Sequence, residues 1–170
     1  MLSKQVPDKA YFVEMVYTHM GIIYKIYKLY AAEEDRDDLK QEIIYQLWLS
    51  YPSFRGDSKF QSWMYRVALN TAMLGLRARK MKYTGLSDHA LEISDDPFEH
   101  EDKEIRIRQL YKQIAKLKDL DKTIIFLYLE QCSYDEIAEI TGISTKNVSV
   151  RLVRIREKLR AQLHIQTTEV

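Results

Sequence analysis

The chain has 170 residues, of which 46% are hydrophobic, and its formal net charge is only +1. This length suits one ordinary domain or two small ones, and the apolar content is sufficient for packed cores, which excludes a wholly disordered chain. The single cysteine, Cys132, excludes an intramolecular disulfide and a cysteine-rich zinc site, and no apolar run approaches the roughly 20 residues that span a bilayer. We therefore expect a cytoplasmic protein with no membrane insertion of its own.

The composition favours helices. There are only 5 glycines and 3 prolines, and apolar residues recur at helical spacing without sustained alternation. We predict an all-α fold. In the first half of the chain this spacing predicts helices over residues 8–31, 38–50 and 58–81. Asp8 can cap the first of them, and Pro52 interrupts the chain between the second and the third.

An acidic segment follows. Eight acids stand against one lysine between Asp88 and Glu104, where helical periodicity is lost. We predict a linker over residues 83–101 that joins an N-terminal helical domain, residues 1–82, to a C-terminal domain, residues 102–170. The near-neutral net charge is thus the sum of two basic domains and the acidic linker between them.

The C-terminal domain contains a helix-turn-helix pattern. Two further helices are predicted over residues 102–118 and 121–131. After them, Ser133-Tyr134-Asp135-Glu136 fits the S-x-x-E capping box, which begins a short helix. Gly142 can take the left-handed conformation that ends this helix, and Ser144 can cap the next one. Both predicted domains are therefore small and helical, and the second is a helix-turn-helix.

Two stripes run along the last predicted helix. The apolar stripe consists of Val148, Leu152, Ile155 and Leu159, and the adjacent polar stripe consists of Asn147, Arg151, Arg154 and Lys158. An α-helix fits the major groove of DNA, where Asn and Arg can bind base edges and Lys and Arg can bind phosphates. The charge stripe alone favours a solvated amphipathic helix. The capped helix and the glycine turn before it favour a DNA-recognition helix instead.

The third predicted helix carries a cationic strip with an aromatic ring in it. Its members are Lys59, Trp63, Arg66, Asn70 and Arg77. Such a strip suits single-stranded DNA, because bases stack on the ring while the cations follow the backbone. Phe54 and Arg55 in the preceding loop could help to form a pocket for a flipped base. The alternative is that Trp63 belongs to the core, and the spacing does not separate the two interpretations.

The second predicted helix carries acidic and aromatic side chains beside its apolar stripe. Asp38, Gln41, Glu42 and Tyr45 lie there, with Leu47 and Trp48 near its end. Trp and Tyr often anchor protein interfaces, so this patch indicates a protein partner. An ordinary solvated helix face is the alternative.

Nothing in the sequence indicates catalysis. The four histidines are scattered, and none has metal-ligand spacing with another His, Cys or acid. A phosphate loop, a glycine-rich dinucleotide turn and a nucleophile elbow are all missing from the sequence. We expect a protein that is not an enzyme and that has no cofactor and no metal site.

Two blocks of the sequence together resemble the extracytoplasmic-function (ECF) family of RNA polymerase sigma factors. The first comprises residues 35–42, Leu47-Trp48, Phe54-Arg55-Gly56 and residues 60–70. The second, residues 133–160, is similar to the promoter-binding domain of that family. Both blocks stand in the family's order with an acidic linker between them, and the resemblance covers nearly the whole chain.

The resemblance implies a bacterial alternative sigma factor that binds core RNA polymerase and directs promoter-specific transcription initiation. The residues that would dock on the polymerase beta-prime coiled coil are Asp38, Leu39, Gln41, Glu42, Leu47 and Trp48. Those that would capture the melted minus-ten element are Phe54, Arg55, Lys59, Phe60, Trp63, Arg66, Asn70 and Arg77. Those that would bind the minus-thirty-five duplex are Thr145, Lys146, Asn147, Ser149, Val150, Arg151, Arg154 and Lys158. Further implied partners are the polymerase beta flap and an anti-sigma factor.

Two other functions remain open at this point. A stand-alone helix-turn-helix regulator would form a dimer on a palindromic operator, and it would need neither the Trp63 strip nor the Leu47-Trp48 block. A helical adaptor that binds only proteins would be indifferent to the loss of Arg151 and Arg154. Val150 is apolar where many relatives are polar, so base preference at that position is not assigned.

Overall fold

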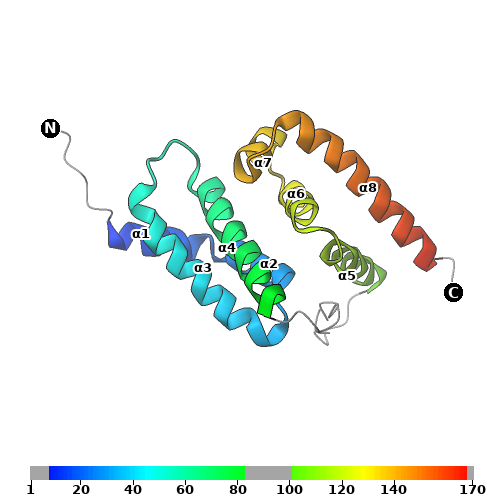
Figure 1. The fold of residues 1–170 in the computed structure, drawn as a ribbon, viewed down its shortest axis with the longest axis horizontal. Coiled ribbons are helices and arrows are strands. Elements are labelled where there is room, and N and C mark those ends of the chain that lie inside the picture. Colours follow the sequence, from blue (N-terminus) through cyan, green and yellow to red (C-terminus); the bar gives the residue numbers. More distant parts are fainter. Residues whose placement is uncertain (1–7, 83–100, 168–170) are drawn as a thin grey trace. The chain divides into compact units, whose positions relative to one another are not determined.

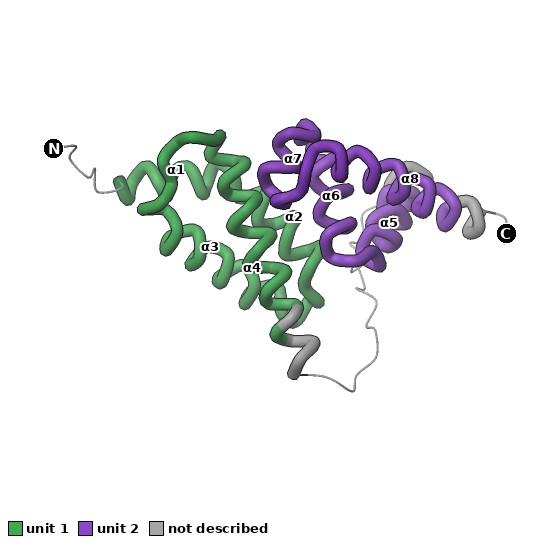
Figure 2. The backbone as a smooth tube through the Cα atoms, turned by 45° about the horizontal axis from the view of Figure 1, so that its top comes forward, with its two compact units in different colours: residues 1–86 green, residues 87–170 purple. Residues whose placement is uncertain are grey.

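The computed structural model describes residues 8–82 and 101–167 of the chain. These residues form eight α-helices and two short 3-10 helices, with no strand among them (Figure 1). The all-α prediction is confirmed. The chain divides into two compact units, residues 1–86 and 87–170 (Figure 2). The predicted linker, residues 83–101, lies outside the described residues except for its last position, so the domain bounds stay a prediction.

Three helices form the core of unit 1. The elements of this unit are α1 (Lys9–Thr18), α2 (Met20–Tyr30), η1 (Glu33–Asp35), α3 (Arg36–Ser50), η2 (Tyr51–Ser53) and α4 (Phe60–Lys82). Helices α2, α3 and α4 all pack against one another. Their fully buried side chains include Ile23, Ile26, Ile43, Leu47, Met64 and Leu69. Burial of each such side chain contributes about 1.5–3 kcal/mol, so this unit has an apolar core of its own.

The single helix predicted over residues 8–31 is wrong, because the structure breaks it at His19. This residue has φ −109° and ψ 20°, and it separates α1 from α2. Its ring Nδ1 lies 2.8 Å from the Met15 carbonyl oxygen, and the Thr18 hydroxyl donates to the Glu14 carbonyl oxygen at 2.8 Å. The apolar residues keep their helical spacing on both sides of His19, so the spacing alone did not predict the break.

The buried side of α4 is shorter than the helix itself. Phe60 and Met64 are buried, but Val67 is only half-buried and Leu74 is 63% exposed. Helix α4 has 23 residues, whereas α2 and α3, which pack against it, have 11 and 15. Burial in α4 accordingly ends at Ala72.

Unit 2 is built around its last helix. Its elements are α5 (Glu101–Ala115), α6 (Asp119–Leu129), α7 (Tyr134–Thr141) and α8 (Thr145–Thr167). Helix α8 packs against all three of the others. The core combines side chains from every helix and includes Ile114, Ile124, Leu127, Ile137, Val148, Leu152, Ile155 and Leu159.

Two isoleucines in the first half of α5 lie at the surface. Ile105 is 54% exposed and Ile107 is 46% exposed, whereas Ile114 and Leu117 are buried. Residues two apart do not share a face of a helix, so the spacing never allowed both isoleucines to face one core.

No described helix combines the length and the apolar character that crossing a bilayer requires.

Candidate nucleic-acid interface

The helix-turn-helix is formed by local interactions that the sequence predicted. Ser133 Oγ accepts the Glu136 N–H at 3.2 Å, and the Glu136 carboxylate accepts the Ser133 N–H at 2.8 Å, which completes the capping box of α7. Gly142 ends α7 with φ +73°, in the left-handed region that favours glycine. Ser144 Oγ then accepts the Asn147 N–H at 3.2 Å in the first turn of α8. The start of α7, the turn and the start of α8 are confirmed.

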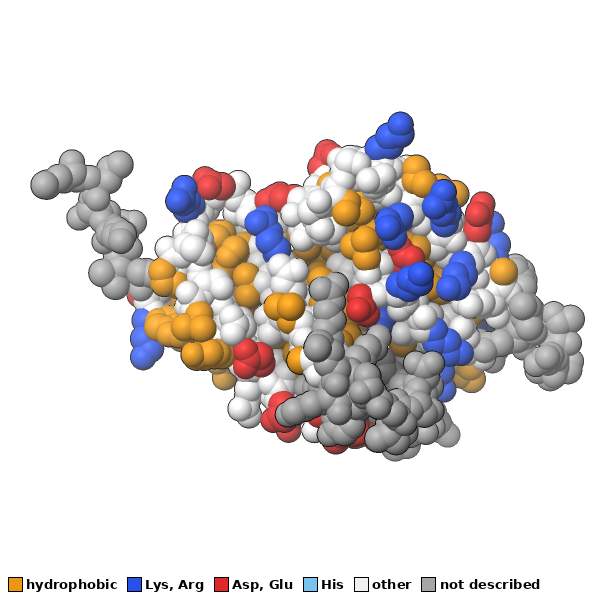
Figure 3. Space-filling view, in the orientation of Figure 1, with side chains coloured by type: hydrophobic (Ala, Val, Ile, Leu, Met, Phe, Trp, Pro, Cys, Tyr) orange, Lys and Arg blue, Asp and Glu red, His pale blue; other side chains and the backbone are white. Residues whose placement is uncertain are grey.

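The two stripes of α8 separate packing from exposure. All four apolar residues are buried, from Val148 at 0% to Leu159 at 5% exposed. In the polar stripe Asn147, Arg154 and Lys158 are exposed, and Arg151 is partly exposed. Of the other predicted residues, Thr145, Lys146 and Val150 are exposed and Ser149 is half-buried. Figure 3 shows Lys and Arg side chains gathered on the part of unit 2 where α8 runs. Most of the residues predicted to bind duplex DNA are therefore exposed on one side of α8, opposite its packed stripe.

Two contacts tie the beginning of α8 to the helices before it. Arg151 Nη1 donates to Asp121 Oδ1 of α6 at 2.6 Å. The Thr145 hydroxyl donates to Asp135 Oδ1 of α7 at 2.9 Å. Asp121 and Asp135 were not among the predicted site residues. They lie 30 and 10 positions from their partners, and only the folded chain brings each pair together.

The residues predicted for single-stranded DNA are divided between surface and core. Arg55, Lys59 and Asn70 are exposed, while Phe54 and Arg66 are half-buried. The structure buries Phe60 at 6% and Trp63 at 8% exposed. Arg77 lies in α4, but its side chain is outside the described residues. The core placement of Trp63, which the sequence left open, is the one that the structure shows.

Trp63 lies in a cluster of aromatic rings that meet at tilted or edge-to-face angles. Its ring centroid is 5.2 Å from those of Phe54 and Phe60, and the centroids of Phe54 and Phe60 are 5.6 Å apart. On its other side Trp63 meets Tyr51 at 6.3 Å. Pairs at these separations attract one another beyond their burial, by about 0.5–1.5 kcal/mol. Phe54, from the loop before α4, thus partly covers the ring predicted to stack on DNA bases.

The aromatic cluster continues to the predicted docking patch. Tyr51 contacts Phe12 of α1 at 4.9 Å, and Phe12 contacts Trp48 of α3 at 5.1 Å. Burial raises the pKa of the Tyr51 hydroxyl, and the nearby acidic groups of Tyr11 and Asp8 add to that rise. Rings from three helices and two connecting segments therefore link the end of α3 to the start of α4.

The predicted docking residues on α3 occupy two faces. Asp38, Gln41 and Glu42 are exposed and Trp48 is 40% exposed, whereas Leu39 and Leu47 are buried at 4% and 0%. The exposed face also contains Tyr45, which the sequence placed in the partner patch but outside the family's docking set, and Leu49, which was not predicted; they are 55% and 52% exposed. The buried Leu39-Ile43-Leu47 stripe was visible in the sequence. Taking the opposite face of the helix, which already included Tyr45, would have found Leu49.

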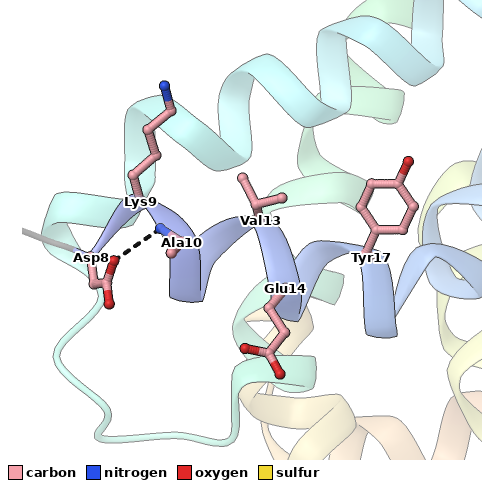
Figure 4. A pocket seen from close by; sticks show the side chains of 6 residues that line it. All are labelled: Asp8, Lys9, Ala10, Val13, Glu14 and Tyr17. Atoms are coloured by element: carbon pink, nitrogen blue, oxygen red, sulfur yellow. Dashed lines mark hydrogen bonds between the residues drawn. The ribbon is translucent and has the colours of Figure 1, made fainter.

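Other surfaces of the described chain offer little for a small ligand. A shallow hollow on α1 is lined by Asp8, Lys9, Ala10, Val13, Glu14 and Tyr17 (Figure 4). All of these residues come from one helix and its cap, so the hollow does not enclose a ligand. Among residues 8–82 and 101–167, no group of three or more His, Cys, Asp or Glu side chains could hold a metal ion.

Comparison with family models matches both units. Residues 16–81 match sigma-70 region 2, and residues 107–159 match the model described as sigma-70, region 4. The first match covers α2, α3 and α4, and the second covers most of α5 and α8 with all of α6 and α7.

Relatives with the same organisation match along nearly their whole length. The chain is 30% identical to the RNA polymerase sigma factor SigV of Bacillus subtilis, over 95% of this chain and 96% of the relative. It is 29% identical to the ECF RNA polymerase sigma factor SigW of the same organism, over 92% and 90%. Among solved structures, the sigma factor RpoE of Bartonella quintana, in complex with the anti-sigma factor NepR, matches with a TM-score of 0.76 at 19% identity, over 92% of this chain and 98% of that one. CnrH, in complex with the cytosolic domain of CnrY, matches with a TM-score of 0.67 at 22% identity, over 93% and 90%.

Proposed function

Because this chain belongs to the ECF family of RNA polymerase sigma factors and is an alternative sigma factor that directs promoter-specific transcription, we propose that it divides promoter recognition between its two units. Unit 2 binds the minus-thirty-five element as duplex, and unit 1 captures the melted minus-ten element. The chemistry of RNA synthesis belongs to the polymerase. The observation that carries this proposal is the exposed polar stripe of α8 beside a fully buried apolar stripe.

Helix α8 enters the major groove with its polar stripe. Asn147 and Arg154 are long enough and exposed enough to reach base edges, and Lys158 binds a phosphate. Lys146 and Thr145, at the exposed beginning of the helix, add phosphate contacts near its N-terminus. The exposed Val150, Val153 pair offers apolar contact to a thymine methyl group.

The aromatic cluster of unit 1 captures unpaired bases. Phe54 is half-buried in a loop, so its displacement opens the face of Trp63 to a base. A base stacked there replaces the Phe54 contact, and base-aromatic stacking is worth about 1–3 kcal/mol per base. Arg55, Lys59 and Arg66 follow the strand backbone, with Asn70 and Arg77 further along α4. Phe60 packs against Trp63 and holds its ring in place.

The exposed face of α3 docks on the polymerase beta-prime coiled coil. Asp38, Gln41 and Glu42 supply polar contacts, and Trp48 supplies the apolar anchor. Tyr45 and Leu49 extend that anchor. Leu39 and Leu47 act by holding α3 in the core of the unit. Contact of unit 2 with the beta flap is proposed on the family resemblance alone.

An anti-sigma factor is a further proposed partner. Both similar structures contain a second protein. RpoE is bound to the anti-sigma factor NepR, and CnrH is bound to the cytosolic domain of CnrY. We propose that this chain is likewise held inactive by a protein that covers its polymerase-binding or DNA-binding surfaces.

The test is reconstituted run-off transcription with purified bacterial core polymerase and a pool of promoter fragments randomised at both elements. The native chain should select a defined pair of elements. Arg66→Ala with Lys59→Ala should weaken transcription from duplex promoters, because both cations are proposed to follow the captured strand, and the loss should be smaller on templates already melted at the minus-ten element. Arg151→Ala with Arg154→Ala should remove selection at the minus-thirty-five element.

The matched control is Arg106→Ala, which removes an exposed arginine from α5 of the same unit as Arg151 and Arg154. It should leave selection unchanged. Duplex binding without polymerase binding or a transcript would overturn the proposal and favour a stand-alone regulator. If the variant without Arg151 and Arg154 selects the same minus-thirty-five element as the native chain, the proposed role of α8 is wrong.

A further inference from the structure

We propose that Asp121 is a positioning residue that fixes Arg151 of α8 for sequence-specific contact with the minus-thirty-five element. Its carboxylate lies in the first turn of α6 and accepts a hydrogen bond from Arg151 Nη1 at 2.6 Å. The side chains of Arg151 and Asp121 are 42% and 27% exposed. This inference rests on the proposed function of α8, and it adds a residue from a helix that has no proposed contact with DNA.

The ion pair is not needed to hold the two helices together. Helices α6 and α8 pack against each other, and both contribute completely buried apolar residues to the core of unit 2, including Ile124, Leu127, Val148 and Leu152. A partly exposed ion pair adds little to such a core, because water screens it and two side chains lose freedom to form it. Its main consequence is the direction in which Arg151 points.

The chemistry of the guanidinium allows it to bind Asp121 and DNA together. The group is planar and carries five N–H donors in a fixed fork. Asp121 accepts one donor at Nη1, which leaves four donors of the fork for a base edge or a phosphate. An arginine that is already oriented loses less side-chain freedom on binding DNA. A larger part of the free energy of its contact is then available to favour the correct base over the others.

The carboxylate also weakens contact with DNA of any sequence. Each phosphate that a protein neutralises releases counterion, which gives a log-log salt slope of about −0.9 per contact. Asp121 offsets part of the charge of Arg151 beside the polyanion. The geometry therefore favours selectivity over affinity, and removal of the carboxylate should change the two in opposite directions.

The test uses holoenzyme reconstituted from bacterial core polymerase and the full chain, with promoter fragments randomised at the minus-thirty-five element. Asp121→Asn keeps the shape and removes the charge. It should reduce base preference at one position of the element by roughly tenfold, which is the scale of a bidentate arginine contact. It should also raise binding to fragments lacking the element. Asp121→Glu, which keeps the charge, should restore part of the preference.

Asp119→Asn is the matched control, because it removes an acid from the same turn of α6. It should leave base preference unchanged. In an Arg151→Ala background, Asp121→Asn should have no further effect on preference. Thermal unfolding of each variant separates a loss of positioning from a loss of fold, since preference is measured on folded holoenzyme.

Two results would overturn the inference and leave the proposed function standing. The first is an unchanged base preference in Asp121→Asn when Arg151→Ala alters it. The second is stronger selection of the same element by Asp121→Asn, which would mean that Asp121 withholds Arg151 from DNA. If Arg151→Ala and Arg154→Ala both leave preference unchanged, the proposed role of α8 fails instead.

Discussion

Helices α4 and α8 each have 23 residues and each carry a proposed DNA-binding strip, but they present it differently. In α8 the residues that pack and the residues proposed to bind DNA form separate stripes. In α4 the aromatic residues proposed to stack on bases are themselves part of the core, with Trp63 at 8% and Phe60 at 6% exposed. A rigid polar surface is sufficient to bind a duplex. An unpaired base needs an apolar ring to stack on, and such a ring would be exposed to water if the protein did not cover it in the absence of DNA.

Because of this contrast, substitutions in the two helices should differ in whether they change folding stability and DNA binding separately or together. Substitution of a buried residue in α8 should affect folding alone, and substitution of an exposed residue should affect DNA alone. In α4 the same ring is buried in the core and is proposed to stack on a base, so the two effects should appear together. Four substitutions test this difference, in order of expected effect.

Trp63→Ala should have the largest effect. Loss of a buried aromatic side chain costs about 3–5 kcal/mol of unfolding free energy. Strand capture should be lost as well, because the ring on which a base is proposed to stack is removed. Urea unfolding followed by circular dichroism measures the first effect, and permanganate reactivity of melted thymines in holoenzyme complexes measures the second. Trp63→Phe should retain part of both. Normal opening by a Trp63→Ala chain that stays folded would contradict the shared role.

Leu152→Ala tests the separation in α8. The side chain is 1% exposed, and its truncation should cost about 2–5 kcal/mol of unfolding free energy. At temperatures where unit 2 stays folded, preference for the minus-thirty-five element should equal that of the native chain. The comparison uses urea unfolding and selection from randomised fragments. An altered preference in the folded variant would show that packing and recognition are not separate in this helix.

Arg154→Ala tests the opposite stripe of α8. The side chain is exposed, so unfolding free energy should change by no more than about 0.5 kcal/mol. Binding of holoenzyme to its selected promoter should weaken by about 1–3 kcal/mol if Arg154 contacts a base edge. Arg106→Ala serves as the control in the same unit. A stability loss as large as that of Leu152→Ala would be the contrary result.

Ser133→Ala should have the smallest effect. It removes the acceptor for the Glu136 N–H and the first half of the capping box, at a cost of about 0.5–2 kcal/mol. The effect should be confined to stability, because Ser133 lies before α7 and has no proposed contact with DNA. Thermal unfolding of the full chain measures it, and Ser133→Thr should be nearly neutral.

The sequence predicted best what depends on neighbouring residues. The capping box of α7, the left-handed Gly142 and the apolar stripe from Val148 to Leu159 all follow from spacing within a few turns. The break at His19 was missed because the apolar residues keep their helical spacing on both sides of it.

Features of the candidate site that depend on distant residues were not predictable. Trp63 borders the apolar face of α4, and rings from η2 and the following loop decide that it is covered. The pairing of Asp121 with Arg151 spans 30 positions and two helices. Leu39 and Leu47 entered the docking set through the family pattern, which does not distinguish a residue that touches the partner from one that holds the helix.

The aromatic cluster also gives the chain an intrinsic optical signal. The sequence has two tryptophans, and both lie in unit 1, with Trp48 40% exposed and Trp63 8% exposed. An exposed indole emits at longer wavelength than a buried one, so docking over Trp48 should shift emission to the blue. A nucleobase stacked on Trp63 should quench it. Fluorescence of the unlabelled chain can therefore time polymerase docking and strand capture as separate events.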